Sequence, residues 1–393
     1  MNIKDQILDC LVDRVKDQYD FSFINLEPDE REFFQQRVNE FFNSKTYDES
    51  ERRARQLLFF LLDNHGKVPV LAPIIDKMNL DELYGEYEFQ GQRLHFLHQV
   101  NVYLLGLYFY YNLESLRNKI NFEMRKTTVR IIDQERNINF RYSSGTEYGE
   151  FLYRWRLTAL CHDMGIGIQL CEGKAKCLSD YLTKLRISTS KNTSLLENLW
   201  LYEENNLLNE LNGIYNKIQF AKSIEFQEAS PYPDSVYHDH GIMGALAFLR
   251  LIRKEYANHP NLISYKDGYK QLIWHPKILT HSILQIALAI ALHNLNENPV
   301  ALKKTCKQLN VKIYNQSSHP LVWLLKISDL LQEWDKPKAK FFSPKEELPP
   351  TTLEIYTDRK SKIMVKGFPE NKISKTEEIL QTYTTPNIIS FIE

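Results

Sequence analysis

Histidine and aspartate side chains recur within or at the ends of the most apolar segments of this chain. They are His98 in LHFLHQVNVYLLG, His162 and Asp163 in LTALCHDMG, His240 in HGIMGALAFL, His293 in AIALHN, and Asp329 in LLKISDLLQEW. A buried imidazole without a partner costs about 1–3 kcal/mol, and a buried ionised carboxylate needs a cation beside it. Imidazole and carboxylate together suit divalent transition metals. The pattern therefore predicts a buried metal centre assembled from five helices.

The order His, His-Asp, His, His, Asp resembles the HD-domain superfamily of metal-dependent phosphohydrolases. The resemblance covers about residues 95–337, and the two additional histidines resemble the family members that hold two metal ions. It implies that Asp163 bridges two divalent ions of Mn, Fe, Co, Ni or Zn and acts as the catalytic residue. It also implies the metal ligands His98, His162, Asp163, His240, His293 and Asp329.

The resemblance further implies an enzyme that hydrolyses a phosphoester or phosphodiester bond, with a nucleotide or nucleotide-derived signal as the expected substrate. Two metals would lower the pKa of a bridging water and stabilise charge on the phosphoryl oxygens. Two other functions stay open: a di-iron oxygenase with the same ligand order, and a binding module that keeps the fold and senses a nucleotide.

Two ligand positions have a competing histidine nearby. His95 precedes His98 by three residues and lies on nearly the same helical face. We favour His98 because HQVNVYLLG is more similar to the first helix of the family. His238 competes with His240, and the sequence HG followed by GA favours His240.

One position departs from the family pattern, because Ile166 stands where many two-metal members have a phosphate-contacting lysine. The basic residues that could replace it are Arg154, Arg156, Lys174, Lys176 and Lys326. We select Arg156 and Lys326 as substrate-binding candidates, because arginine suits phosphate geometry and Lys326 lies three residues before Asp329. Each of the five is equally compatible with a solvated surface charge.

The elements that must position these residues are mainly α-helical. Apolar residues at three- and four-residue spacing predict three helices within residues 1–88, an N-terminal extension. Residues 89–340 are expected to form a helical bundle, the HD-domain core. Its last helix has Ser317 or Ser318 as a candidate N-cap and Pro320 in the first turn.

Beyond a proline-containing linker, residues 351–393 predict a small β-β-α-β tail, so that the fold is mainly α with a small C-terminal α+β unit. Three strands and one helix make a small core, so we expect this tail to need docking or oligomerisation for stability. We also expect it to lie outside the metal site, so that its removal leaves the metal content intact.

Composition excludes some classes of protein. The 393 residues carry a net charge of −1, which gives no overall positive field for nucleic acid. The most apolar stretch, 94–111, contains two histidines and is expected to be a buried helix rather than a membrane span. The N-terminus lacks signal-peptide character, and the five cysteines form no CxxC pair. We expect a cytoplasmic protein with a small-molecule phosphoester as its partner, and homo-oligomerisation stays open.

Overall fold

The structure is a computed structural model, and thirteen continuous stretches together with parts of one further helical segment are described below. The stretches are 1–17, 28–63, 95–126, 130–133, 138–141, 147–166, 263–266, 269–272, 283–293, 319–336, 345–358, 362–383 and 388–392. The further segment contributes the helical residues 240–241, 244–245, 247–249 and 252. All six sequence-predicted ligands fall within the described residues.

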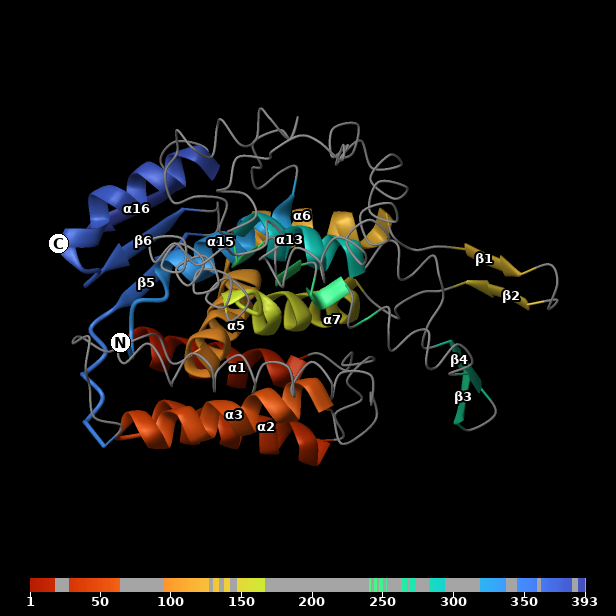
Figure 1. The fold of residues 1–393 in the computed structure, drawn as a ribbon, viewed down its shortest axis with the longest axis horizontal. Coiled ribbons are helices and arrows are strands. Elements are labelled where there is room, and N and C mark those ends of the chain that lie inside the picture. Colours follow the sequence, from red (N-terminus) through yellow and green to blue (C-terminus); the bar gives the residue numbers. More distant parts are fainter. Residues whose placement is uncertain are drawn as a thin grey trace, which may run out of the picture.

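Three N-terminal helices pack beneath the central helices (Figure 1), in agreement with the three helices predicted for this part of the chain. They are α1 (Ile3–Asp17), α2 (Pro28–Phe42) and α3 (Tyr47–Asp63). Ile3, Ile7 and Leu11 bury one face of α1 at helical spacing, and α3 does the same with Leu58 and Leu62. Their buried side chains belong to the same apolar cluster as the rest of the protein.

Helix α5 (His95–Asn112) is the central element of the fold. It packs against α1, α3, α7 and α15, and all its residues from Phe96 to Tyr111 are buried. This burial on every face explains why the segment is apolar all round. Among the described helices, none has both the length and the apolarity required to cross a bilayer.

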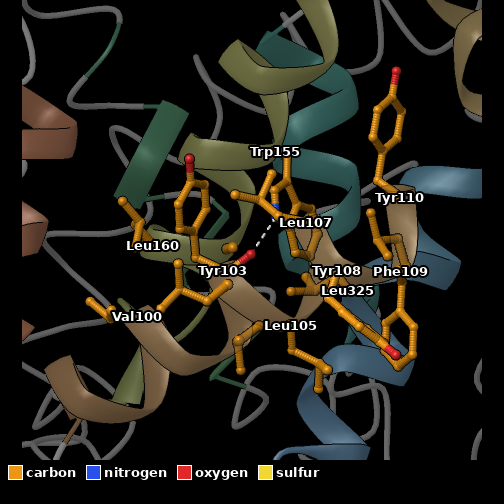
Figure 2. Packing of buried hydrophobic residues seen from close by; sticks show 14 of the residues in the cluster. Val100, Tyr103, Leu105, Leu107, Tyr108, Phe109, Tyr110, Trp155, Leu160 and Leu325 are labelled. Atoms are coloured by element: carbon orange, nitrogen blue, oxygen red, sulfur yellow. Dashed lines mark hydrogen bonds between the residues drawn. The ribbon is translucent and has the colours of Figure 1, made fainter. Parts of the chain in front are cut away.

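Helix α7 (Glu147–Cys161) crosses α5 at close range, and one glycine permits this approach. A Cβ on Gly106 of α5 would overlap the ring of Trp155 from α7. The indole Nε1 of Trp155 donates a hydrogen bond of 2.9 Å to the carbonyl oxygen of Tyr103, as Figure 2 shows. The close contact sets the distance between His98, on α5, and the end of α7.

Helices α13 (Leu284–His293) and α15 (Pro320–Leu331) complete the central group, because α13 packs on α7 and α15, and α15 packs on α5. The first-turn position of Pro320 is confirmed. The predicted serine cap is wrong, because the residue at the N-cap is His319, whose side chain makes no capping hydrogen bond.

One helix and two hairpins lie between the main helices that the sequence predicts, and the helix lies within residues 112–148, where additional helices or lids were expected. The three elements are α6 (Glu114–Lys126), the antiparallel pair β1 (Arg130–Asp133) and β2 (Ile138–Arg141), and the antiparallel pair β3 (Ile263–Lys266) and β4 (Tyr269–Leu272). Both hairpins lie at the end of the molecule opposite the C-terminal sheet (Figure 1).

The C-terminal residues form the predicted β-β-α-β order. Strands β5 (Glu354–Thr357) and β6 (Ile363–Lys366) pair antiparallel, and β7 (Ile389–Ile392) pairs parallel to β6 after the crossover helix α16 (Glu370–Tyr383). This unit is docked on the helices. Ile3 donates its backbone N–H to Leu353 over 2.7 Å, and the Tyr108 hydroxyl donates to the Ile355 carbonyl over 2.9 Å.

Candidate metal centre

The carboxylate of Asp163 lies where several helices meet, and histidines approach both of its oxygens. His162 Nε2 lies 3.4 Å from Oδ2, and His95 Nδ1 and His98 Nε2 each lie 3.8 Å from the same oxygen. On the other side, His240 Nε2 lies 3.4 Å from Oδ1 and His293 Nε2 lies 3.6 Å from it. Each oxygen of one carboxylate therefore faces its own set of imidazoles.

These contacts divide into two groups with metal-ligand spacing that share Asp163. One contains His98, His162 and Asp163, and the other contains Asp163, His240 and His293. Asp329 joins the first group, because its Oδ1 lies 3.0 Å from His98 Nε2. All six sequence-predicted ligands thus lie in one place. The structure also brings in His95, and the competing His238 lies outside the described residues.

Three of the imidazoles are oriented by a hydrogen bond at the same ring atom, Nδ1. His162 Nδ1 lies 2.8 Å from the Ala159 carbonyl oxygen, and His293 Nδ1 lies 2.6 Å from the Ile290 carbonyl oxygen. His98 Nδ1 lies 2.6 Å from Gln332 Oε1. Since these oxygens can only accept, each Nδ1 donates a proton, and each Nε2 faces a carboxylate oxygen, which for His98 is Asp329 Oδ1 at 3.0 Å. Such partners select the tautomer that binds a metal.

Two glycines allow the turn after α7 to approach the segment that begins at His240. A Cβ on Gly165 would overlap the carbonyl oxygen of His240, and a Cβ on Gly244 would lie 3.0 Å from the Gly165 nitrogen. The main role of Gly165 is therefore this backbone contact, which places His240 against Asp163. Gly167 lies outside the described residues.

Lys326 contacts the backbone of a candidate ligand. Its side chain is buried, and Nζ donates a hydrogen bond of 2.5 Å to the carbonyl oxygen of His293, the last residue of α13. A cation at this position satisfies a carbonyl at the end of the helix. Lys326 thus holds the backbone of a candidate ligand.

The remaining basic candidates differ in their surroundings. Arg154 is paired with the buried Glu150, and Lys174 and Lys176 lie outside the described residues. Arg156 is buried, and its Nε and Nη1 have no hydrogen-bond partner within the described part of the chain. Burial lowers the pKa of this guanidinium, although Tyr103 and Tyr153 oppose the shift. An uncompensated buried cation keeps Arg156 as a candidate for binding an anion.

The electrostatics of the cluster suit a cation. Burial lowers the pKa of His162 to about 4, so the ring is neutral near pH 7. Burial alone would raise the pKa of Asp163, but His162, His240, His293 and His95 together hold it well below its usual range. A neutral His162 beside an ionised Asp163 is in the protonation state that metal binding requires.

Unsatisfied polar atoms at the centre also fit a bound metal. Asp163 Oδ2 and His162 Nε2 are buried without a hydrogen-bond partner among the described residues. Buried polar atoms that lack partners are rare and need an explanation. An ion between them would supply one, and the nitrogen and oxygen donor set suits a first-row transition metal.

Sequence reasoning missed Gln332, which contacts the His98 ring. In the sequence, Gln332 is a polar residue three positions after Asp329, directly after a mostly apolar helix. No family model, curated protein or solved structure matches the chain. The assignment of the candidate site therefore rests on the geometry of the residues that form it.

Proposed function

We propose that the protein is a two-metal phosphohydrolase of the HD type that hydrolyses a phosphoester or phosphodiester bond, with nucleotides as the substrate class. The observation that carries the proposal is the position of Asp163, whose two oxygens face separate groups of histidines. A bridging carboxylate between two ligand sets is the arrangement that a two-metal hydrolytic site requires. The mainly helical fold is compatible with an HD domain.

The ligand set that we assign consists of His98, His162 and Asp329 on one side, His240 and His293 on the other, and Asp163 between them. Bound divalent metals would lower the pKa of a water molecule and neutralise charge on the phosphoryl oxygens. The chain contributes fixed tautomers, an ionised carboxylate and a buried environment. In this environment His98, His162 and His293 are almost entirely excluded from solvent.

Exposure distinguishes the members of the cluster. The side chains of His95, Asp329 and His240 are 15%, 15% and 17% exposed, whereas His162 is fully buried. A phosphoryl group must approach from the accessible side. We assign to His95 the contact with a phosphoryl oxygen, because its ring nitrogens have no hydrogen-bond partner among the described residues and Ile166 cannot supply the family's lysine contact. Arg156 is the second candidate for that contact.

The test is metal analysis of the purified protein, followed by phosphate-release assays on nucleotides and cyclic dinucleotides, with and without oxygen. We expect about two metal equivalents, oxygen-independent hydrolysis, and loss of both hydrolysis and at least one metal in Asp163→Ala. Activity that requires oxygen without phosphate release would favour the di-iron oxygenase. A protein that binds a nucleotide but no metal would favour the sensing module. Unchanged metal content and activity in Asp163→Ala would refute the two-metal site.

A further inference from the structure

Gln332 at the C-terminal end of α15 contacts a candidate ligand from outside the ligand set. Its amide group is buried, with Oε1 2.6 Å from His98 Nδ1 and Nε2 2.6 Å from the carbonyl oxygen of Trp334. The amide has only one workable orientation, because a flip would place its oxygen against the Trp334 carbonyl oxygen. Gln332 must therefore accept a proton from His98 Nδ1, so Nε2, which faces Asp329 Oδ1 at 3.0 Å, is the nitrogen available to a metal.

An ion pair links the turn that contains Gln332 to the first helix of the chain. Asp335, one residue after Trp334, is buried and has a positive φ of 56°, a conformation that costs a residue other than glycine about 1–2 kcal/mol. Lys4 Nζ of α1 lies 2.8 Å from Asp335 Oδ1 and 2.7 Å from Oδ2. An ion pair of this kind holds the turn in place, since removing Lys4 would leave a buried carboxylate without its cation.

A second contact reaches the same turn from the C-terminal unit. Glu333 is paired with Lys336 in the turn and with Lys372 of α16. The segment 332–336 is therefore attached to the N-terminal helix on one side and to the tail on the other. Both appendages of the helical core thus meet at the residues that adjoin Gln332.

We propose that Gln332 is a positioning residue for His98, and that Lys4, through Asp335, holds Gln332 in the orientation that selects the metal-binding tautomer. This inference rests on the proposed function in that it takes His98 to be a metal ligand. It assigns to α1 a role in the affinity of one metal position, the one formed by His98, His162 and Asp329. The position formed by His240 and His293 has no contact with this turn among those described.

The test compares metal binding in full-length variants by calorimetric titration with Zn²⁺ and by the absorption spectrum of the Co²⁺ form. Gln332→Met removes both amide contacts and is expected to weaken one metal equivalent about 10- to 100-fold, while the other is retained. Gln332→Glu keeps an acceptor for His98 Nδ1 but sets a second oxygen against the Trp334 carbonyl oxygen, so its metal affinity is expected to lie between those of Gln332→Met and the wild type. Lys4→Met is expected to weaken the same equivalent to a smaller degree.

Gln99→Met is the matched control, because Gln99 is a buried glutamine adjacent to His98 whose Oε1 has no hydrogen-bond partner among the described residues. It is expected to leave both equivalents intact. Equal affinities in Gln332→Met and Gln99→Met would overturn the inference. Nitrogen-15 spectra of the histidine rings in the metal-free protein give a second readout, in which Gln332→Met removes the Nδ1–H preference of His98 and Gln332→Glu retains it.

Different results would refute the proposed function and the positioning role of Gln332. A wild-type protein that binds no metal would refute the proposed function, and the ring spectra would still decide whether Gln332 selects the tautomer. A wild-type protein that binds two metals, with an unchanged His98 tautomer in Gln332→Met, would refute only the positioning role. Circular dichroism on each variant confirms that a loss of metal is not a loss of fold.

Discussion

Gly165 and His240 are in direct backbone contact, and any side chain at position 165 would overlap the His240 carbonyl oxygen. We therefore expect Gly165→Ala to displace His240 from Asp163 and to weaken the metal equivalent that His240 and His293 hold. Overpacking of this kind typically costs about 1–3 kcal/mol of stability. Metal titration and thermal unfolding of the variant measure both effects.

Gly244→Ala is the graded control for this prediction. Its added methyl group would lie 3.0 Å from the Gly165 nitrogen and 3.4 Å from a side-chain carbon of Ile290, so the neighbours need to move only slightly. We expect a smaller loss of metal affinity than in Gly165→Ala. The reverse ranking would show that the turn after α7 does not position His240.

The histidine and aspartate positions were predictable because ligand-type residues in apolar helices are conspicuous. His98, Asp163 and His293 each interrupt or end an apolar run, and the structure places them together. The functions of Gly165 and Lys326 were not predictable, because both depend on contacts between elements far apart in the sequence. Lys326 is three residues from Asp329, which favoured a role toward substrate, yet its ammonium group binds the end of α13.

The helical elements and the tail were likewise predictable from periodicity and β-branched residues, whereas the two hairpins were not. The strand Ile138–Arg141 alternates apolar and polar residues over only four positions, which is too short a pattern to distinguish from a loop. The prediction of a serine N-cap for α15 was wrong for a related reason. Two serines precede His319, and serine is a common N-cap residue, so residue type alone favoured them.

His95 and His98 are expected to respond differently to substitution. His98→Ala removes a nitrogen that lies 3.0 Å from Asp329 and should eliminate one metal equivalent. His95→Ala should retain both metals and lower kcat/KM about tenfold or more, the loss expected for one hydrogen bond to a charged phosphoryl group. Metal titration and steady-state kinetics separate the two. Loss of metal in His95→Ala would place His95 among the ligands instead.

The stability of the metal-free protein should decrease as the pH falls from about 6.5 to about 4. Burial lowers the pKa of His319 to about 4, so in this window the unfolded chain binds a proton that the folded protein does not. As the pH falls from about 6.5 to about 4, His319 lowers the free energy of unfolding by about 3 kcal/mol at most. Above pH 6.5 His319 does not change the free energy of unfolding. Burial of His162 acts in the same direction.

Urea unfolding of the metal-free wild type and of His319→Gln at pH 7, 6, 5 and 4.5 measures this effect. The variant should show a shallower dependence on pH, because it lacks one of the two histidines, among the described residues, whose pKa is lowered by burial. The same slope in both proteins would show that His319 does not contribute.

Removal of the C-terminal unit should destabilise the whole protein, which revises the expectation drawn from the linker. Leu353 and Ile355 are buried in the cluster shared with the helices, and their backbones bind Ile3 and Tyr108. A chain that ends at Pro349 loses these contacts and the Lys372 contact to Glu333. We expect a lower unfolding temperature and weaker metal binding. Wild-type values for both would show that the tail is independent.

Two adjacent residues of β5 test the same docking without truncation. Ile355 is fully buried, and its N–H donates to the side chain of Gln6 on α1 over 3.1 Å, whereas the Tyr356 side chain is exposed on the opposite face of the strand. Ile355→Ala removes buried apolar contacts between the tail and the helices and should cost about 2–5 kcal/mol of unfolding free energy. Tyr356→Ala, the matched control, should stay within about 0.5 kcal/mol of the wild type. Denaturant unfolding measures both values. If Ile355→Ala destabilises only the strands, seen as a separate unfolding transition with the helical signal unchanged, then the tail folds on its own and does not support α1.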